Sequence, residues 1–326
     1  MNNLHSGRIS QALIYTGKLF RLFIFKNDWK VLPMAAVIAA LVAYVMGERI
    51  FNNMAGTLLG SFGFTCICVW NGCFNSIQAV CRERPIVKRE HRSGLHMSSY
   101  ILAHMTYQAF ICICQSVIIV AVMHIANIRF PAVSHMTGNV NIDFLVTFFL
   151  ITYASDMTAL FISSVVRNTT TAMTIMPFVM IFELVFSGGL FALPSASEGL
   201  TDFAISKWGL NSLCSIGEYN TLPNDAIIGA LDKMDISRLS DEPITDEDMG
   251  ESDITLTESA QIMKEYLEDP DTRARFMVKC GLMAYKEDFA STADNILTCW
   301  LNMLGSVILF PILSVISLEF IDKDKR

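Results

Sequence analysis

Long runs of apolar residues, separated by short polar stretches, dominate the pattern along this chain. A helix that crosses the hydrocarbon core of a bilayer needs about 20 predominantly apolar residues. Six runs reach or approach that length, and Pro33 in the first and shortest run suits the first turn of a helix. The runs occupy residues 31–47, 57–81, 99–126, 142–166, 170–193 and 293–318. The pattern therefore predicts an all-α integral membrane protein with six transmembrane helices.

Composition and charge support this prediction and orient the spans. Hydrophobic residues make up 52% of the chain and charged residues 17%, and the mean hydropathy is +0.44. Lys and Arg gather in residues 1–30, in residues 82–97 and at the C-terminus, whereas the two opposite short loops hold only Arg49 and Arg129. The positive-inside rule then places both termini in the cytoplasm. We expect a multi-pass protein of the plasma membrane without a cleavable signal.

The first 30 residues have the pattern of a basic amphipathic helix. Five basic residues alternate with apolar ones, which are Ile9, Leu13, Phe20, Phe23 and Ile24. Such a segment lies in the membrane interface with its apolar face toward the acyl chains. The alternative is a frayed tail that merely flanks the first span.

The fifth and sixth spans are separated by about 100 residues, which the orientation places outside the cell. Residues 193–291 contain 20 acidic and 8 basic side chains, so this segment accounts for the chain's net charge of −7. Residues 200–219 are mildly apolar and predict a short re-entrant or interfacial helix. Residues 232–253 are acidic and poor in large apolar residues, so we expect them to be mobile. Residues 257–289 read as helical, with Pro270 interrupting the helix or starting a second one.

These features divide the chain into segments rather than into separate globular domains. We expect a cytoplasmic connecting helix at 1–30, five spans at 31–193, an acidic outer loop at 194–291, and the sixth span with a cytoplasmic tail at 292–326. No basic-aromatic surface indicates nucleic-acid binding.

Motifs for metals, phosphates and disulfides are weak. The acidic run from Asp246 does not fit an EF-hand, because Gly falls at the fifth position and Thr257 at the twelfth. Of nine Cys residues, only Cys214 and Cys280 lie outside the spans, and either a disulfide or two free thiols is compatible with the sequence. The chain has no G-x-x-x-x-G-K-[ST] motif, so we expect no phosphate-binding loop and no cofactor in this chain. Asn168 suits the N-cap of the fifth span.

The loop between the second and third spans, residues 82–98, carries the most specific residues. It contains five basic residues and two acidic ones. Pro85 suits the first turn of a short helix, and Gly94 suits its C-terminal cap. The loop therefore predicts a short charged helix on the cytoplasmic side.

The same loop resembles the first cytoplasmic loop of ABC exporter permeases of the ABCG-like, type-2 class. The matching residues are Glu83-Arg84, Val87, Arg89-Glu90 and Gly94-Leu95-His96, followed by Ser99-Tyr100 and Leu102-Ala103, with His96 where the family usually has Tyr. In that family the loop rests on the ATPase and relays its closure to the spans. The resemblance thus implies ATPase coupling by Glu83, Arg84, Arg89 and Glu90. It also implies an ABC ATPase partner that binds ATP-Mg, and a second permease copy or paralogue.

Polar side chains inside the spans are the remaining signal. A carboxylate near the middle of a bilayer costs about 2.5–3.5 kcal/mol on insertion scales, so it usually faces protein or water. Glu183 lies deep in the fifth span, and Asn71 and Asn75 lie four residues apart on the second. The family resemblance implies that these two spans line the substrate path, which makes all three residues path candidates. Interhelical hydrogen bonding alone is the alternative, with Asn71, Asn75 and Asp156 as candidate partners of Glu183.

Taken together, the sequence predicts the non-catalytic permease subunit of an ATP-driven exporter of a lipid, a peptide or a hydrophobic small molecule. Two other classes stay open. One is a channel or secondary transporter that needs no ATPase, which internal inverted repeats would favour. The other is a membrane-anchored sensor or scaffold that binds a partner through its outer loop.

Overall fold

The computed structural model describes residues 7–25, 28–47, 49–189, 198–222 and 286–320, and within these residues every regular element is a helix. The elements are α1 (Arg8–Phe25), η1 (Asp28–Lys30), α2 (Val31–Met46), α3 (Met54–Ser76), α4 (Ala79–Arg92), α5 (Met97–Ile125), α6 (Val140–Val165), α7 (Thr169–Phe186), α8 (Glu198–Thr201), α9 (Ile205–Ile216), η3 (Tyr219–Thr221), η5 (Glu287–Phe289) and α13 (Ala293–Glu319). The predicted all-α class is confirmed.

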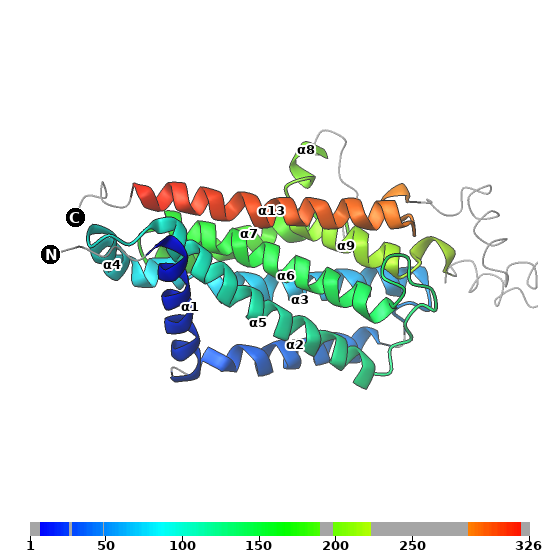
Figure 1. Cartoon of the computed structure of the whole chain (residues 1–326). Coiled ribbons are helices and arrows are strands. Elements are labelled where there is room, and N and C mark those ends of the chain that lie inside the picture. The colour runs from blue at the N-terminus through cyan, green and yellow to red at the C-terminus, as the bar shows by residue number, and fades with distance from the viewer. Residues whose placement is uncertain (1–6, 26–27, 48, 190–197, 223–285, 321–326) are drawn as a thin grey trace, which may run out of the picture.

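The long helices run side by side, and α1 lies crosswise at one end of the bundle, near α4 (Figure 1). The start of α1 and the end of α13 lie at that same end. Helix α6 is at the centre, where it packs against α3, α5, α9 and α13. Its buried side chains, among them Phe144, Phe148 and Ile151, form the middle of the hydrophobic core.

Among the residues that the structure describes, five helical segments are long and apolar enough to cross a membrane: Met54–Arg92, Met97–Ile125, Val140–Val165, Thr169–Phe186 and Ala293–Glu319. The first predicted span appears as α2, an apolar helix of 16 residues. At 1.5 Å per residue, such a helix is about 24 Å long, which is shorter than the ~30 Å hydrocarbon core. The structure therefore supports a multi-pass membrane protein with five full-length candidate spans.

The charged loop helix differs from its prediction at the N-terminal end. Pro85 was expected in the first turn of the helix, but α4 begins at Ala79 and contains Pro85 in its interior. The Ser163 hydroxyl of α6 accepts hydrogen bonds from the backbone N–H groups of Val80 (3.0 Å) and Cys81 (3.1 Å). These donors belong to the first turn of the helix, which has no intrahelical acceptors for them. The Ser163 side chain, 83 residues from Val80 along the chain, thus stabilises a first helical turn that lies before Pro85.

The predicted C-terminal end of this helix is confirmed. Gly94 has a φ of +102°, in the left-handed region that glycine adopts without strain. Its N–H donates to the His91 carbonyl, and the Leu95 N–H donates to the Glu90 carbonyl, both at 3.0 Å. This pair of bonds is the Schellman arrangement that ends helices.

Other helix ends carry the caps that their sequences indicate. The Asn168 side chain accepts a hydrogen bond of 2.8 Å from the Thr171 N–H, as expected for the N-cap of the fifth span. The side chains of Asn53, Asn139 and Thr292 cap α3, α6 and α13 in the same way. These local signals explain why the predicted starts of the spans agree with the structure within a few residues, whereas two predicted ends were too late: the second span ends at Ser76 instead of Cys81, and α7 ends at Phe186, before the predicted residue 193.

The predicted helix at residues 200–219 is largely α9, and it is buried. It packs against α3, α6 and α13, and its N-terminal part also contacts α7. The Asn295 side chain of α13 donates to the Ser215 hydroxyl at 3.0 Å and to the backbone carbonyls of Asp288 and Ala290. Cys214 is a buried free thiol, and Cys280 lies outside the described residues. So do residues 232–253 and most of the helix predicted at 257–289.

Helices α3 and α6 approach each other closely at Gly72 of α3. A Cβ atom at this position would lie 2.2 Å from the Thr152 carbonyl oxygen and 2.8 Å from the Asp156 nitrogen, both in the α6 backbone. Atoms cannot overlap to that extent, so only glycine lets the two backbones pack this closely. Small residues have this role at many helix interfaces in membranes.

We therefore predict that Gly72→Ala destabilises the protein by about 1–3 kcal/mol, the usual cost of overpacking a well-packed core. Thermal unfolding of the purified protein in detergent would measure the loss. Gly305→Ala is the matched control, because nothing lies within 4 Å of a Cβ added there in the middle of α13. The control should change stability by less than about 1 kcal/mol. Equal effects of the two changes would contradict the close α3–α6 contact.

Candidate functional site

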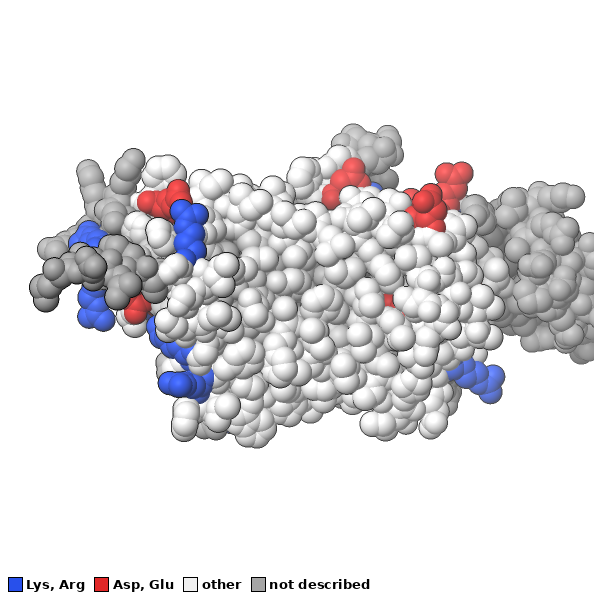
Figure 2. Space-filling model, in the orientation of Figure 1, with Lys and Arg blue, Asp and Glu red and all other residues white. Residues whose placement is uncertain are grey.

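The end of the bundle formed by α1 and α4 carries the coupling candidates. On the face shown in Figure 2, Lys and Arg side chains gather at this end, and the flanks of the long helices carry almost no charge. Arg89 is exposed on α4, together with Arg82, Pro85, Ile86 and Arg92. These five residues define the outer face of α4, which another protein can reach, and Arg82 also borders a cavity described below.

The other three coupling candidates face inward and connect α4 to the rest of the fold. The Arg84 guanidinium donates to the backbone carbonyls of Ser164 (2.8 Å) and Val166 (3.0 Å) at the C-terminal end of α6. A cation there also suits the negative end of the helix dipole. The Glu90 carboxylate accepts a hydrogen bond from the Tyr15 hydroxyl of α1. Glu83 is buried, with 9% of its surface exposed.

Several hydrogen bonds join helix α1 to the charged loop and to the start of α5. The Gln11 side chain donates to the Gly94 carbonyl (3.2 Å) and accepts from the His96 N–H (3.1 Å). The Ser99 hydroxyl donates to the Arg8 carbonyl at 2.9 Å. Burial, followed by the hydrogen bond to Glu90, raises the pKa of Tyr15, so the phenol stays protonated and keeps donating. Helices α1 and α4 therefore form one connected unit.

The structure does not bring the three predicted path residues together. Asn75 exchanges hydrogen bonds of 2.9 Å and 3.2 Å with Gln115 of α5, so its side chain serves the packing of α3 on α5. Asn71 is buried on α3, and its Nδ2 atom has no hydrogen-bond partner among the described residues. Glu183 lies on α7, directed toward the start of α9.

Glu183 has a partner that the sequence did not indicate. Its carboxylate accepts a hydrogen bond of 2.9 Å from the Ser206 N–H, and the Ser206 hydroxyl donates to the Glu183 carbonyl. The expected partners Asn71, Asn75 and Asp156 are therefore replaced by the first turn of α9. A carboxylate at this position satisfies an unpaired N–H and meets the positive end of the helix dipole. Glu183 thus caps α9 from another helix.

An apolar pocket of about 400 Å³ lies between α3 and α7. Its walls include Trp70, Phe74, Met176, Met180 and Ile181, and Glu183 and Ser206 supply its polar edge. The rings of Trp70 and Phe74 stack with their centroids 5.8 Å apart. Such a volume and lining are typical of sites for hydrophobic ligands.

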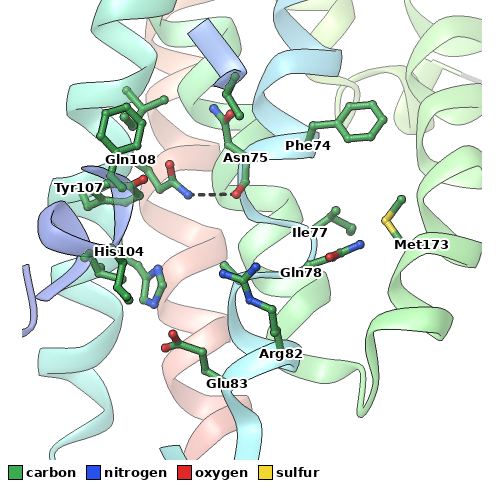
Figure 3. Close-up of a pocket in the computed structure, with 16 residues that line it drawn as sticks. Phe74, Asn75, Ile77, Gln78, Arg82, Glu83, His104, Tyr107, Gln108 and Met173 are labelled. Atoms are coloured by element: carbon green, nitrogen blue, oxygen red, sulfur yellow. Dashed lines mark hydrogen bonds between the residues drawn. The ribbon is translucent and has the colours of Figure 1, made fainter. Parts of the chain in front are cut away.

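A second, more polar cavity of about 410 Å³ lies between α1, the junction of α3 and α4, and α5 (Figure 3). Two predicted site residues, Asn75 and Glu83, line this cavity, but sequence reasoning did not predict the cavity itself, because its polar wall combines several segments. Asn75 comes from α3, Arg82 and Glu83 come from α4, and His104 and Gln108 come from α5. His104, a single histidine within an apolar span, was the signal in the sequence that could have indicated this cavity.

The comparison with known protein families identifies the chain's relatives. The family model described as "ABC-2 type transporter" matches residues 19–216, which extend from within α1 to the end of α9. No curated protein gave a significant match. The matched region contains the charged loop, both helices of the apolar pocket and Glu183, and it spans well over half of the 326 residues. The chain therefore belongs to the ABC-2 type transporter family, the membrane permeases of ABC transporters.

Proposed function

We propose that this chain is the permease subunit of an ABCG-like exporter that moves a lipid, a peptide or a hydrophobic small molecule, while a separate ABC ATPase subunit hydrolyses ATP. The observation that carries the proposal is the apolar pocket between α3 and α7. It lies on the two helices that the family resemblance assigns to the substrate path, and its lining suits a hydrophobic substrate.

A second permease, either a copy of this chain or a paralogue, would complete the path. Helix α7 packs against α3, α4 and α9, and its other face exposes Phe178 (70%) and Ile181 (59%). Ile181 also lines the apolar pocket. A partner on this face would cover the exposed apolar side chains and close the pocket between two subunits, as expected for a symmetric or pseudo-symmetric dimer.

Coupling to the ATPase would use the unit formed by α1 and α4. In this proposal the outer face of α4, including Arg89, rests on the ATPase. Arg84 passes a displacement of α4 to the end of α6, and Glu90 passes it to α1 through Tyr15. Glu83 fixes the inner face of the same helix, where its side chain is buried.

We further propose six spans in the plasma membrane with both termini in the cytoplasm. The start of α1, helix α4 and the end of α13 share one end of the bundle (Figure 1), which suits an even number of crossings. Helix α2 packs along α3 and α5 and supplies the sixth crossing. Its shortfall of a few Å is of a size that local bilayer thinning accommodates.

Cysteine labelling of intact cells tests this topology. In a variant without reactive native thiols, Ser240→Cys should react with a membrane-impermeant reagent added outside. Arg89→Cys and Lys325→Cys should react only after the cells are opened. Labelling of position 89 from outside would contradict the six-span arrangement.

Purification from native membranes tests the exporter assignment. We expect an ABC ATPase to co-purify, and Arg89→Glu should reduce the retained ATPase tenfold or more, because like charges across an interface cost several kcal/mol. Arg129→Glu is the control, since Arg129 is exposed and belongs to the opposite short loop. If no ATPase accompanies the unaltered protein, the chain acts as an ATPase-independent channel or transporter.

Glu183 provides a test of the substrate path. Glu183→Gln retains an oxygen acceptor for the Ser206 N–H, so assembly with the ATPase should be preserved. Glu183→Ala leaves that buried N–H without a partner, which costs about 1–3 kcal/mol. We expect the Ala variant to lower substrate-stimulated ATPase activity more than basal activity.

Ser206→Ala is the matched control for this test, because it removes a hydroxyl from the same contact and keeps the N–H. Thermal unfolding and ATPase assays on all three variants separate the roles of Glu183. If Glu183→Ala abolishes assembly and basal activity falls with it, Glu183 is a packing residue and the path assignment is wrong.

A further inference from the structure

The polar cavity between α1, α4 and α5 combines apolar and polar side chains in its wall. Leu22, Phe23, Phe74, Ile111 and Met173 are apolar, and Asn75, Gln108 and the groups on α4 are polar. Figure 3 shows Arg82 and Glu83 extending from α4 toward the cavity, with His104 facing them from α5. The volume of about 410 Å³ lies within the usual range for small-ligand sites.

Several polar atoms in this wall are buried and have no partner in the described part of the chain. Glu83 is 9% exposed and His104 is 3% exposed. The Oε2 atom of Glu83 and both ring nitrogens of His104 make no hydrogen bond there. A buried polar group without a hydrogen bond is costly, and such groups in native proteins usually serve a ligand, an ion or water. These side chains therefore point to something that binds in the cavity.

The charges in the wall define the chemistry of that ligand. Arg82 carries a positive charge and its neighbour Glu83 a negative one, and among the described residues their side chains form no ion pair with each other. A ligand with only a negative charge would meet Glu83, and a ligand with only a positive charge would meet Arg82. A headgroup that carries both an ammonium and a phosphate group can satisfy both side chains. His104 can donate a further hydrogen bond to the phosphate.

The surroundings indicate that this headgroup belongs to an amphiphile. Phe74 and Met173 line both this cavity and the apolar pocket between α3 and α7. The apolar pocket therefore adjoins the polar cavity at these two side chains, close enough to receive the acyl chain of an amphiphile whose headgroup lies in the polar cavity. Apolar walls around one polar end are the arrangement that a lipid requires.

We propose that the cavity lined by Arg82, Glu83 and His104 binds the headgroup of a zwitterionic lipid of the phosphatidylethanolamine type. The ammonium group lies at Glu83, and the phosphate lies at Arg82 and His104. Because two of these residues belong to α4, the bound lipid also holds the coupling helix against α5. The site does not depend on the export function, since binding requires no ATPase.

Native mass spectrometry of the full chain in detergent tests the proposal, with short-chain phosphatidylethanolamine, phosphatidylglycerol, diacylglycerol and an alkylammonium amphiphile as probes. The unaltered protein should bind phosphatidylethanolamine saturably and at least tenfold more tightly than the other three. Arg82→Gln should weaken this binding tenfold or more and shift the preference toward the alkylammonium probe. Glu83→Gln should shift it toward phosphatidylglycerol.

Arg129→Gln and Glu287→Gln are the matched controls, because both residues are exposed and lie outside the cavity. They should leave the order of preference unchanged. A loss of packing would weaken all probes together, so the opposite shifts in the two cavity variants are the diagnostic result. Absence of saturable binding, or the same preference in both cavity variants, would overturn the proposal and leave water in the cavity.

Photo-crosslinking of the unaltered protein covers the case in which the cavity variants do not fold. A phosphatidylethanolamine with a photoreactive group near its headgroup should label peptides that contain Phe23, Tyr107 or Gln78, all of which line the cavity. Competition by unlabelled phosphatidylethanolamine should remove this labelling. Labelling confined to the outward faces of α2 and α13 would contradict the site.

Discussion

The close contact between the α3 and α6 backbones at Gly72 is the constraint on which the rest of the structure depends. Since an added Cβ would overlap the Thr152 carbonyl, the two helices can pack this tightly only at one relative position. Helix α6 in turn contacts α5, α9 and α13. The position of α6 also places the Ser163 hydroxyl at the start of α4 and the Ser164 carbonyl beside Arg84. The position of the charged helix is thus set from the middle of the bundle.

The junction between α3 and α4 lies beside two adjoining cavities that share Phe74 and Met173 in their walls. Before the junction, α3 presents Trp70 and Phe74 to α7 and forms the apolar pocket. After the junction, Arg82 and Glu83 of α4 line the polar cavity together with residues of α5. An apolar and a charged lining therefore lie next to each other along one helical segment.

Two acidic side chains in the functional region, Glu183 and Glu90, stabilise a helix end and a contact between helices. Glu183 caps α9 through the Ser206 N–H, and Glu90 joins α4 to α1 through the Tyr15 hydroxyl. Glu183 joins α7 to α9 beside the apolar pocket, and Glu90 joins α4 to α1 beside the polar cavity. A carboxylate that bridges two helices in this way combines a structural role with a position at the proposed path or coupling surface. The roles are separable because an amide can retain the hydrogen bond while removing the charge.

The sequence alone determined the helices, their approximate boundaries and the family resemblance. Hydrophobic run length, the caps at Asn168 and Gly94, and the residue pattern of the charged loop are local properties, and neighbouring residues are sufficient to read them. The tertiary structure decided which polar groups meet. Ser163 lies about 80 residues from the α4 backbone groups that it caps, and Ser206 lies 23 residues from Glu183. Neighbouring residues could not show that Pro85 stands inside a helix, that Asn75 pairs with Gln115 or that Glu83 is buried. Each of these outcomes depends on a partner that only the packing of separate helices brings close.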